Sequence, residues 1–214
     1  MTLLAVNVGL PRTVDWHGKS VQTSIWKYPV EGAVRVGTLN LEGDQQSDLS
    51  VHGGADKAVY VYPSEHYASW GRELPGTELP WGAFGENFTT RGLLEDAVQI
   101  GDHLEIGSAA FVVTQPRMPC FKLGIRFGRA DMVKRFLQSG RSGFYLKVLR
   151  AGHVTAGDAI KCRAGTSGVR VSDIVALYST DADNQPLLRR VSELPALPAA
   201  WRDYFRKRLW EPDA

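Results

Sequence analysis

Short apolar segments with alternating polar positions dominate the first 163 residues of the chain. Alternation over about four to eight residues, bounded by Gly, Pro, Asn or Asp, is typical of β-strands with one buried face. The pattern predicts strands at residues 3–8, 21–28, 34–36, 58–62, 109–114, 143–149 and 159–162, and a further strand after the turn at 85–88. Residues 96–106 also alternate, with a hairpin-type turn expected at Gly101 and Asp102. Many short strands with few helices favour a closed β-barrel over a layered α/β fold.

Helical periodicity is rarer and gathers near the C-terminus. Within the strand-rich part, apolar residues at helical spacing predict only two short helices, over residues 64–70 and 130–137. A linker of small residues follows at 164–168. Beyond the linker, the pattern predicts three further helices, at residues 172–178, 185–194 and 198–210.

The length of 214 residues suits one domain with a small appendage. We therefore predict a mainly β fold class, with a closed β-barrel domain that includes a few short helices over residues 1–163. A small three-helix C-terminal extension is expected over residues 164–214.

Charge and cysteine content narrow the functional class. The formal net charge of +2 is too small to argue by itself for a nucleic-acid or membrane partner. No stretch approaches the ~20 apolar residues of a membrane span, and the first residues lack the pattern of a signal peptide. The two cysteines, Cys120 and Cys162, form no C-x-x-C motif, so a cytoplasmic location with reduced thiols is expected.

Cys120 is the main candidate for chemistry. It lies between Pro116 and Pro119 on one side and Lys122 and Arg126 on the other, with Arg117 also near, in a segment expected to be a rigid loop. Cationic neighbours favour the thiolate, which attacks electrophiles and binds soft metals. The alternative is a buried packing residue, the common fate of a cysteine that is not in a disulfide.

A glycine pair supplies a second candidate site. Gly53 and Gly54 follow His52 and precede Lys57. Paired glycines let backbone N–H groups surround an anion, to which Lys57 would add a charge. The alternative is an ordinary glycine turn with a solvated lysine. A Cys120–His52 dyad for acyl transfer is conceivable, but no local signature supports it.

Three further polar residues are candidates. Glu86 could accept a hydrogen bond or transfer a proton, and Asn87 could bind a polar ring edge. Both also suit a simple turn. Arg141 could bind a phosphate, or it could cap the C-terminus of the preceding helix. The five histidines show no zinc-binding spacing.

Taken together, these segments resemble the MOSC superfamily, related to the C-terminal part of molybdenum cofactor sulfurase, and within it the YiiM-type proteins. The likeness extends over nearly the whole chain, including the helical tail. It rests on the order and spacing of short motifs at residues 43–46, 52–58, 85–88, 115–122, 140–145 and 157–158.

The resemblance implies a β-barrel that binds molybdenum cofactor in its molybdopterin form, with Cys120 as the protein ligand to the metal. It also implies reduction of N-hydroxylated compounds, such as hydroxylaminopurine base analogues, to amines. Electrons would come from a separate reductase, expected to be a flavoprotein. Neither a membrane nor a nucleic-acid polymer is an expected partner, and a homodimer is possible.

The resemblance and the motifs together assign roles to individual residues. Cys120 holds the metal, and His52 or Glu86 passes protons. The remaining candidates bind the cofactor or the substrate. They are the cations Lys57, Arg117, Lys122, Arg126 and Arg141, the nest glycines Gly53 and Gly54, and Asn87.

Two other functions remain open from the sequence. The protein could be a non-redox molybdenum cofactor carrier or a sulfur-transfer protein with a persulfide on Cys120. It could also be a non-catalytic binding barrel, for example for RNA. The near-neutral charge and the lack of a basic stripe interleaved with aromatic residues argue against RNA.

Overall fold

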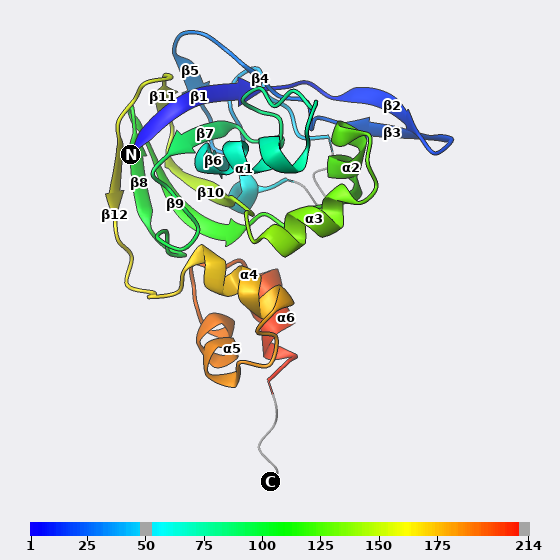
Figure 1. The fold of residues 1–214 in the computed structure, drawn as a ribbon. Helices are drawn as coiled ribbons and strands as arrows, with labels where there is room; N and C mark the ends of the chain where they lie inside the picture. The colour runs from blue at the N-terminus through cyan, green and yellow to red at the C-terminus, as the bar shows by residue number, and fades with distance from the viewer. Residues whose placement is uncertain (48–52, 210–214) are drawn as a thin grey trace.

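An eight-stranded mixed sheet organises the molecule (Figure 1). The computed structural model describes residues 1–47 and 53–209. The strand order is β12-β8-β9-β10-β6-β7-β1-β4, and two further pairs, β11-β5 and β2-β3, lie outside this sheet. The strands are β1 (Thr2–Val8), β2 (Arg12–Trp16), β3 (Lys19–Thr23), β4 (Tyr28–Pro29), β5 (Val34–Val36), β6 (Val59–Pro63), β7 (Phe88–Arg91), β8 (His103–Ile106), β9 (Ala109–Pro116), β10 (Phe144–Arg150), β11 (Gly152–Val154) and β12 (Ile160–Arg163).

The expectation of a closed barrel was wrong. The outermost strands of the sheet, β12 and β4, are not neighbours, so the sheet keeps two edges. The start of β1 contacts residues 157–160 through one bridge, between Thr2 and Ala159, and three backbone hydrogen bonds, but β1 and β12 are not neighbours in the sheet order. The sheet is also mixed, because β6 and β7 run parallel while the other pairs are antiparallel. Alternating apolar residues identify strands with one buried face, but they do not specify whether the outermost strands pair.

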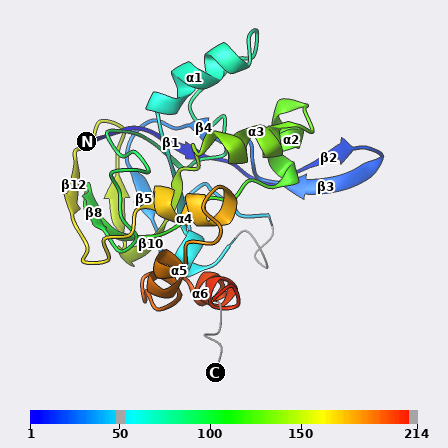
Figure 2. The same cartoon turned by 60° about the horizontal axis from the view of Figure 1, so that its bottom comes forward.

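The described residues contain six short α-helices. They are α1 (Glu65–Glu73), α2 (Phe121–Phe127), α3 (Met132–Ser139), α4 (Val171–Ser179), α5 (Gln185–Ser192) and α6 (Ala199–Arg206). The helical C-terminal part agrees with the sequence pattern, and α4, α5 and α6 gather at one end of the molecule (Figure 1, Figure 2). None of these helices has the length and apolar character to cross a membrane.

Several elements differ from the predicted ones. Helix α2 and the β2-β3 hairpin were not predicted. Over residues 96–106, the turn expected at Gly101 is present and β8 follows it from His103, but the residues before the turn form no strand. Asp102 explains this departure, because its carboxylate accepts hydrogen bonds from the backbone N–H groups of Gln99 and Gly165 at 2.8 Å each. Side-chain bonds of this kind compete with a β-ladder.

Two hydrophobic clusters fill the interior. One lies within the sheet and includes Phe88 and Phe111, whose rings meet edge to face at 5.8 Å. The other is aromatic and packs α1 and α3 against β6 through Trp70, Phe136 and Tyr62. Burying each of these large rings contributes roughly 1.5–3 kcal/mol. The second cluster forms the rigid backing of the segment that carries Cys120.

Candidate active site

Cys120 lies where β9 has ended and α2 is about to begin. Pro116 is the last residue of β9, and Cys120 is the N-cap of α2 with an extended backbone. The Leu123 N–H donates to the Cys120 carbonyl oxygen at 2.9 Å, which closes the first helical turn. Residues 117–120 form the loop that was expected around Cys120, and a helix that was not predicted begins directly after the cysteine. The Cys120 side chain is half-buried, and it is not in a disulfide.

A cleft of about 100 Å³ opens beside Cys120. Its walls come from distant parts of the chain, namely residues 23–27, residues 45–47, the strands β6 and β10, the turn at Gly85, and the residues around Cys120. The lining residues are Thr23, Ser24, Ile25, Lys27, Gln45, Gln46, Ser47, Tyr60, Gly85, Arg117, Met118, Cys120, Lys122 and Tyr145. Cys120 thus faces an open basin rather than an aliphatic interior.

Arg117 is a buried cation in the wall of this cleft. The residue is only 6% exposed, and its guanidinium lies 5.0 Å from the ring centres of both Tyr60 and Phe136. Its Nη1 atom has no hydrogen-bond partner among the described residues. Burial by itself would lower the pKa of Arg117, but nearby Tyr60, Tyr145 and Cys120 outweigh it and leave the pKa raised. Arg117 therefore stays charged, and its Nη1 can still donate a hydrogen bond to a ligand.

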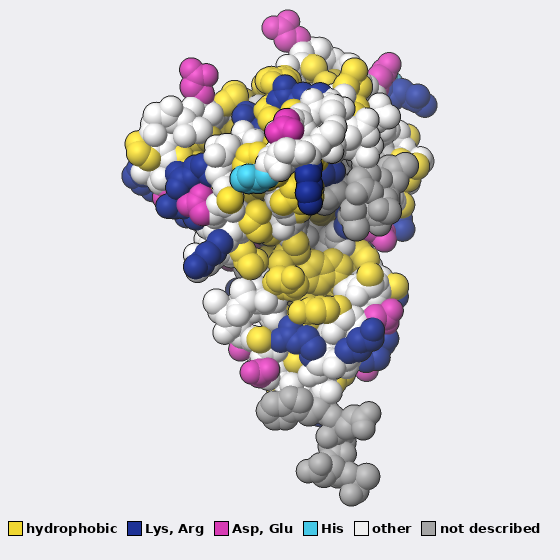
Figure 3. All heavy atoms as spheres, turned by 90° about the vertical axis from the view of Figure 1, so that its right-hand side faces the viewer, with side chains coloured by type: hydrophobic (Ala, Val, Ile, Leu, Met, Phe, Trp, Pro, Cys, Tyr) yellow, Lys and Arg dark blue, Asp and Glu magenta, His cyan; other side chains and the backbone are white. Residues whose placement is uncertain are grey.

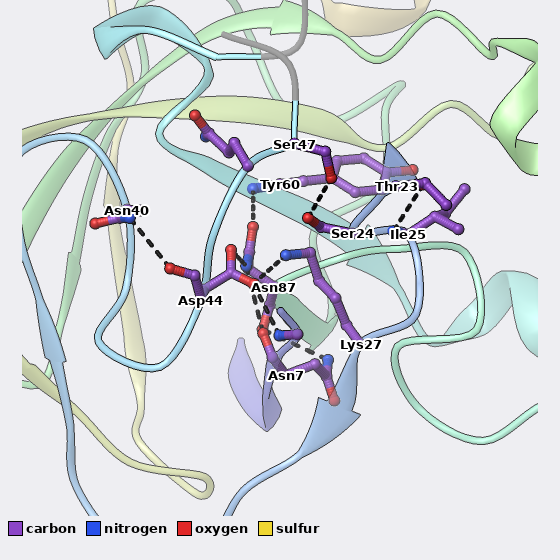
Figure 4. Close-up of polar contacts among 12 residues, drawn as sticks. Asn7, Thr23, Ser24, Ile25, Lys27, Asn40, Asp44, Ser47, Tyr60 and Asn87 are labelled. Carbon is purple, nitrogen blue, oxygen red and sulfur yellow. Dashed lines mark hydrogen bonds and ion pairs between the residues drawn. The ribbon is translucent and has the colours of Figure 1, made fainter. Parts of the chain in front are cut away.

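Lys27, which lines the cleft, belongs to a network of buried polar groups centred on Asp44 (Figure 4). Lys27 forms an ion pair with this carboxylate, and Asn87 donates to it from Nδ2 at 2.9 Å. The Gly9 N–H also donates to Asp44, at 2.9 Å. Burial lowers the pKa of Lys27, although the attraction of Asp44 opposes this. The Lys27 charge is thus largely balanced inside the protein.

Asn87 positions other groups and is not part of the cleft wall. Its Oδ1 accepts from the Tyr60 N–H at 3.1 Å, and its Nδ2 also donates to the Asn7 carbonyl oxygen at 3.3 Å. The side chain is buried, and both ends are occupied by protein groups. It links β6, β7 and β1, and it fixes the strand from which the Tyr60 ring extends.

Glu86 is fully buried and also lies outside the cleft wall. Its carboxylate accepts from the Gly82 N–H at 2.9 Å, the Phe84 N–H at 3.1 Å and the Thr89 hydroxyl at 2.9 Å, and also from the Tyr67 hydroxyl. Burial raises the pKa of Glu86, and the hydrogen bonds oppose that shift. In this geometry the carboxylate holds the turn that precedes β7.

The glycine pair does not line the cleft, but its segment is connected to the cleft by a hydrogen bond from Gln46. Gly54, with φ +94°, precedes a short 3-10 helix over Ala55–Lys57, and the Lys57 carbonyl oxygen accepts from Gln46 Nε2 at 3.0 Å. Gln46 lines the cleft, so it joins this segment to the site. Burial lowers the pKa of Lys57. His52, the predicted proton carrier, lies outside the described residues.

Two of the predicted cations lie apart from the cleft. Arg141 forms an ion pair with Glu73 and stacks over Trp70 at 4.4 Å, between α1 and α3. Arg126 lies over the Phe127 ring at 5.8 Å, and its Nε has no partner among the described residues. Of the predicted site residues, the cleft wall therefore brings together Cys120, Arg117 and Lys122.

Sequence reasoning missed the two tyrosines that face Cys120 across the cleft. Tyr60 and Tyr145 are register partners on the adjacent strands β6 and β10, with ring centres 5.3 Å apart. Burial raises the pKa of both hydroxyls, although Arg117 opposes the shift. Both stand in strand-like segments, where an aromatic residue normally suggests core. The motif at residues 43–46 contains Gln45 and Gln46, which line the cleft. It was the sequence feature that could have identified the wall opposite Cys120.

The donor set suits a metal that arrives with ligands of its own. In the described ranges, no three His, Cys, Asp or Glu side chains come close enough to hold an ion. Cys120 offers one soft thiolate, and Arg117 and Lys122 beside it offer donors to an anionic group. The spare Nη1 of Arg117 fits a phosphate or a similar oxygen-rich group. These residues fit a metal–pterin cofactor with a single bond to the protein.

Comparison with known proteins gives consistent results along the chain. The MOSC domain family matches residues 48–161, and the family described as YiiM-like, 3-alpha helix domain matches residues 171–210. YflK of Bacillus subtilis (strain 168) is 41% identical over 208 residues, covering 97% of this chain and 94% of YflK.

A solved structure and a longer protein extend this picture. The crystal structure of YiiM from Geobacillus stearothermophilus matches with a TM-score of 0.82 at 36% identity, covering 98% of this chain and 99% of that one. A Gibberella moniliformis (strain M3125 / FGSC 7600) protein named Reductase is 35% identical over 146 residues. The match covers 67% of this chain but only 26% of that protein.

Proposed function

The chain belongs to the MOSC family, in its YiiM-like branch, and on that premise we propose that it is a molybdenum cofactor-dependent reductase of N-hydroxylated compounds. The substrate class and the cofactor are those that the motif resemblance implies. The observation that carries the proposal is the arrangement of Cys120 and the buried Arg117 along one open cleft.

The protein's own residues would have separate tasks. Cys120 would supply the thiolate ligand, while Arg117 and Lys122 would hold the anionic part of the cofactor. The cofactor, when bound, supplies the two-electron chemistry that breaks the N–O bond. Tyr145 lines the cleft and is half-buried, and its raised pKa keeps its hydroxyl protonated at neutral pH. That hydroxyl can donate a hydrogen bond to the oxygen that leaves the substrate.

The proposed reaction consumes two electrons and two protons for each N–OH group. The products are the amine and one water molecule. The electrons would come from a separate protein. In the Gibberella moniliformis relative named Reductase, the matched segment is about a quarter of a longer chain. By analogy, we propose that the rest of the Reductase chain supplies the electrons in that protein, and that a separate flavoprotein supplies them to this chain.

Cofactor content and turnover together test this function. Protein made in a host that synthesises molybdenum cofactor is expected to contain about one molybdenum per chain and to release a fluorescent pterin on oxidation. Cys120→Ser should lose molybdenum and turnover of N-hydroxyadenine while keeping its fold, because serine is nearly isosteric with cysteine. The matched control, Cys162→Ser, removes an exposed thiol far from the cleft and should change neither. Metal-free wild type that still reduces N-hydroxyadenine would show that the proposal is wrong. A sulfur adduct of about 32 Da on Cys120 would instead support persulfide chemistry.

A further inference from the structure

The segment that follows Cys120 is basic. Residues 121–139, which form α2 and α3, contain five Lys and Arg residues against one Asp. This segment therefore has a net charge of +4, whereas the whole chain has +2, so the remaining residues together carry −2. The five cations are Lys122, Arg126, Arg129, Lys134 and Arg135, which we call the α2–α3 basic surface.

About half of this net charge is exposed to a partner. Lys134 is exposed, and the side chains of Arg129 and Arg135 are 41% and 40% exposed. Asp131 pairs with both arginines and so neutralises only one of them. Among the described residues that line the groove beside α3, the other acidic residue, Glu73, is paired with Arg141.

The surface begins at the reactive cysteine. Phe121, directly after Cys120, is 51% exposed, although a ring of this size normally lies in the core. Lys122 reaches the cleft itself. Figure 3, which faces the side where α2 lies in Figure 1, shows Lys and Arg side chains on the body and on the C-terminal helices, with hydrophobic side chains exposed between them. An exposed aromatic ring beside cations, as at Phe121 and Lys122, is a common feature of protein docking sites.

We propose that the α2–α3 basic surface, with Phe121 at its inner edge, is the docking site for an acidic flavin-carrying electron-transfer domain. This inference rests on the proposed reductase function. It adds where the electron donor binds and that the donor is acidic. A reduced flavin domain bound there delivers two electrons beside the cleft. Those electrons, with two protons from solvent, convert the N–OH group to the amine and water, and the flavin is left oxidised.

Charge complementarity selects this partner. Opposite charges steer encounter and can raise association rates by about 10- to 1,000-fold at low ionic strength. Because the Debye length is roughly 10 Å at 0.1 M salt, the rate of a steered reaction falls as salt is added. The rest of the chain has a net charge of −2, so residues 121–139 carry more than the whole net positive charge of the protein.

The test compares two electron donors and two double variants. Arg129→Glu with Lys134→Glu reverses two charges of the surface without touching the cleft wall. The matched control, Lys161→Glu with Arg163→Glu, reverses two exposed charges on β12, at the opposite side of the molecule from α2 (Figure 1, Figure 2). One donor is a reduced acidic flavodoxin, and the other is methyl viologen radical, a small cation that acidic substitutions do not repel.

With flavodoxin at low salt, the α2–α3 variant is expected to lose about 10- to 100-fold in kcat/KM, whereas the β12 control loses less than about 3-fold. With methyl viologen, both variants should match the wild type. The wild-type rate with flavodoxin should fall as salt is raised, and the rate of the α2–α3 variant should change little. Lys134→Glu alone, at an exposed site with no ion pair within the described part of the chain, should show a smaller loss of the same kind.

Four results would overturn the docking proposal. They are an equal loss with both donors, an equal loss in the β12 control, a flavodoxin rate independent of salt, and wild type that turns over with methyl viologen but not with flavodoxin. Loss of single-stranded RNA binding in the α2–α3 variant, with an unchanged flavodoxin rate, would identify a nucleic-acid surface instead. If neither donor supports turnover by wild-type holoenzyme, the reductase function itself is wrong, and the docking proposal falls with it.

Discussion

Arg117→Met separates the electrostatic role of this residue from its role in packing. Methionine has a similar length and can occupy the space between Tyr60 and Phe136, but it removes the charge next to Cys120. An opposite charge nearby typically shifts an ionisation by about 1–3 pH units. The pH midpoint of Cys120 alkylation should therefore rise by a similar amount in the variant.

The expected change in rate follows from that shift. Each unit reduces the thiolate population tenfold, but the more basic thiolate is about threefold more nucleophilic. The net slowing is about 3- to 4-fold per unit, or roughly 4- to 40-fold for a shift of about 1–3 units, at a pH well below the midpoint.

Arg117→Met should change the stability of the protein much less than it changes the reactivity of Cys120. Two desolvated cation–π contacts, about 2 kcal/mol each, are lost. This loss is offset because the variant no longer buries a charge whose Nη1 lacks a partner. A net change within about 2 kcal/mol corresponds to a shift in Tm of less than about 8 °C for a chain of this size.

The assay is the pH dependence of iodoacetamide alkylation of cofactor-free protein. A Cys162→Ser background removes the exposed second thiol. Arg117→Lys, which keeps the charge, should preserve most of the reactivity, and Lys122→Gln should have a smaller effect because this residue is less buried and better screened. An unchanged midpoint in Arg117→Met would refute the argument that Arg117 favours the Cys120 thiolate.

Two further predictions concern stability. Gly143→Ala should destabilise the protein by more than about 3 kcal/mol in chemical denaturation, because the added Cβ would lie 2.3 Å from the Val61 carbonyl oxygen at a φ of +60°; a change below about 1 kcal/mol would contradict this geometry. The Arg129 and Arg135 side chains lower the pKa of Asp131 to about 2, so its contribution is present above pH 4 and is lost as pH falls towards 2. The gap in Tm between wild type and Asp131→Asn should narrow over that range, and a constant gap would show that Asp131 is not linked in this way.

The reactive segment itself was readable from the sequence. Pro116 and Pro119 restrict their neighbours by local sterics, and cations beside Cys120 are close in space because they are close in sequence. Arg117 and Lys122 reach the cleft for this reason. The motifs also identified the family. Local geometry and short-range charge are properties of consecutive residues, so they need no knowledge of the fold.

The opposite wall of the cleft was decided only by tertiary structure. Tyr60 and Tyr145 are 85 positions apart, and they meet because β6 and β10 pair in one particular register. Lys27 and Asp44 form an ion pair although they are 17 positions apart, and Asn87, directly before β7, donates a hydrogen bond to Asp44. A slip of one residue would move either tyrosine to the other face of the sheet. Such register depends on the summed packing of the whole sheet rather than on the segments alone.

The same reason explains the error about the barrel and the separation of the predicted cations. A period of two marks a strand with one buried face, but the pairing of the outermost strands depends on residues far away, so alternation could not reveal the free edges of β12 and β4. Arg141 was grouped with Cys120 from the order of motifs, yet its side chain pairs with Glu73 between α1 and α3. The identity of a side chain shows what it can bind, whereas the long-range contacts of the folded chain decide what it meets.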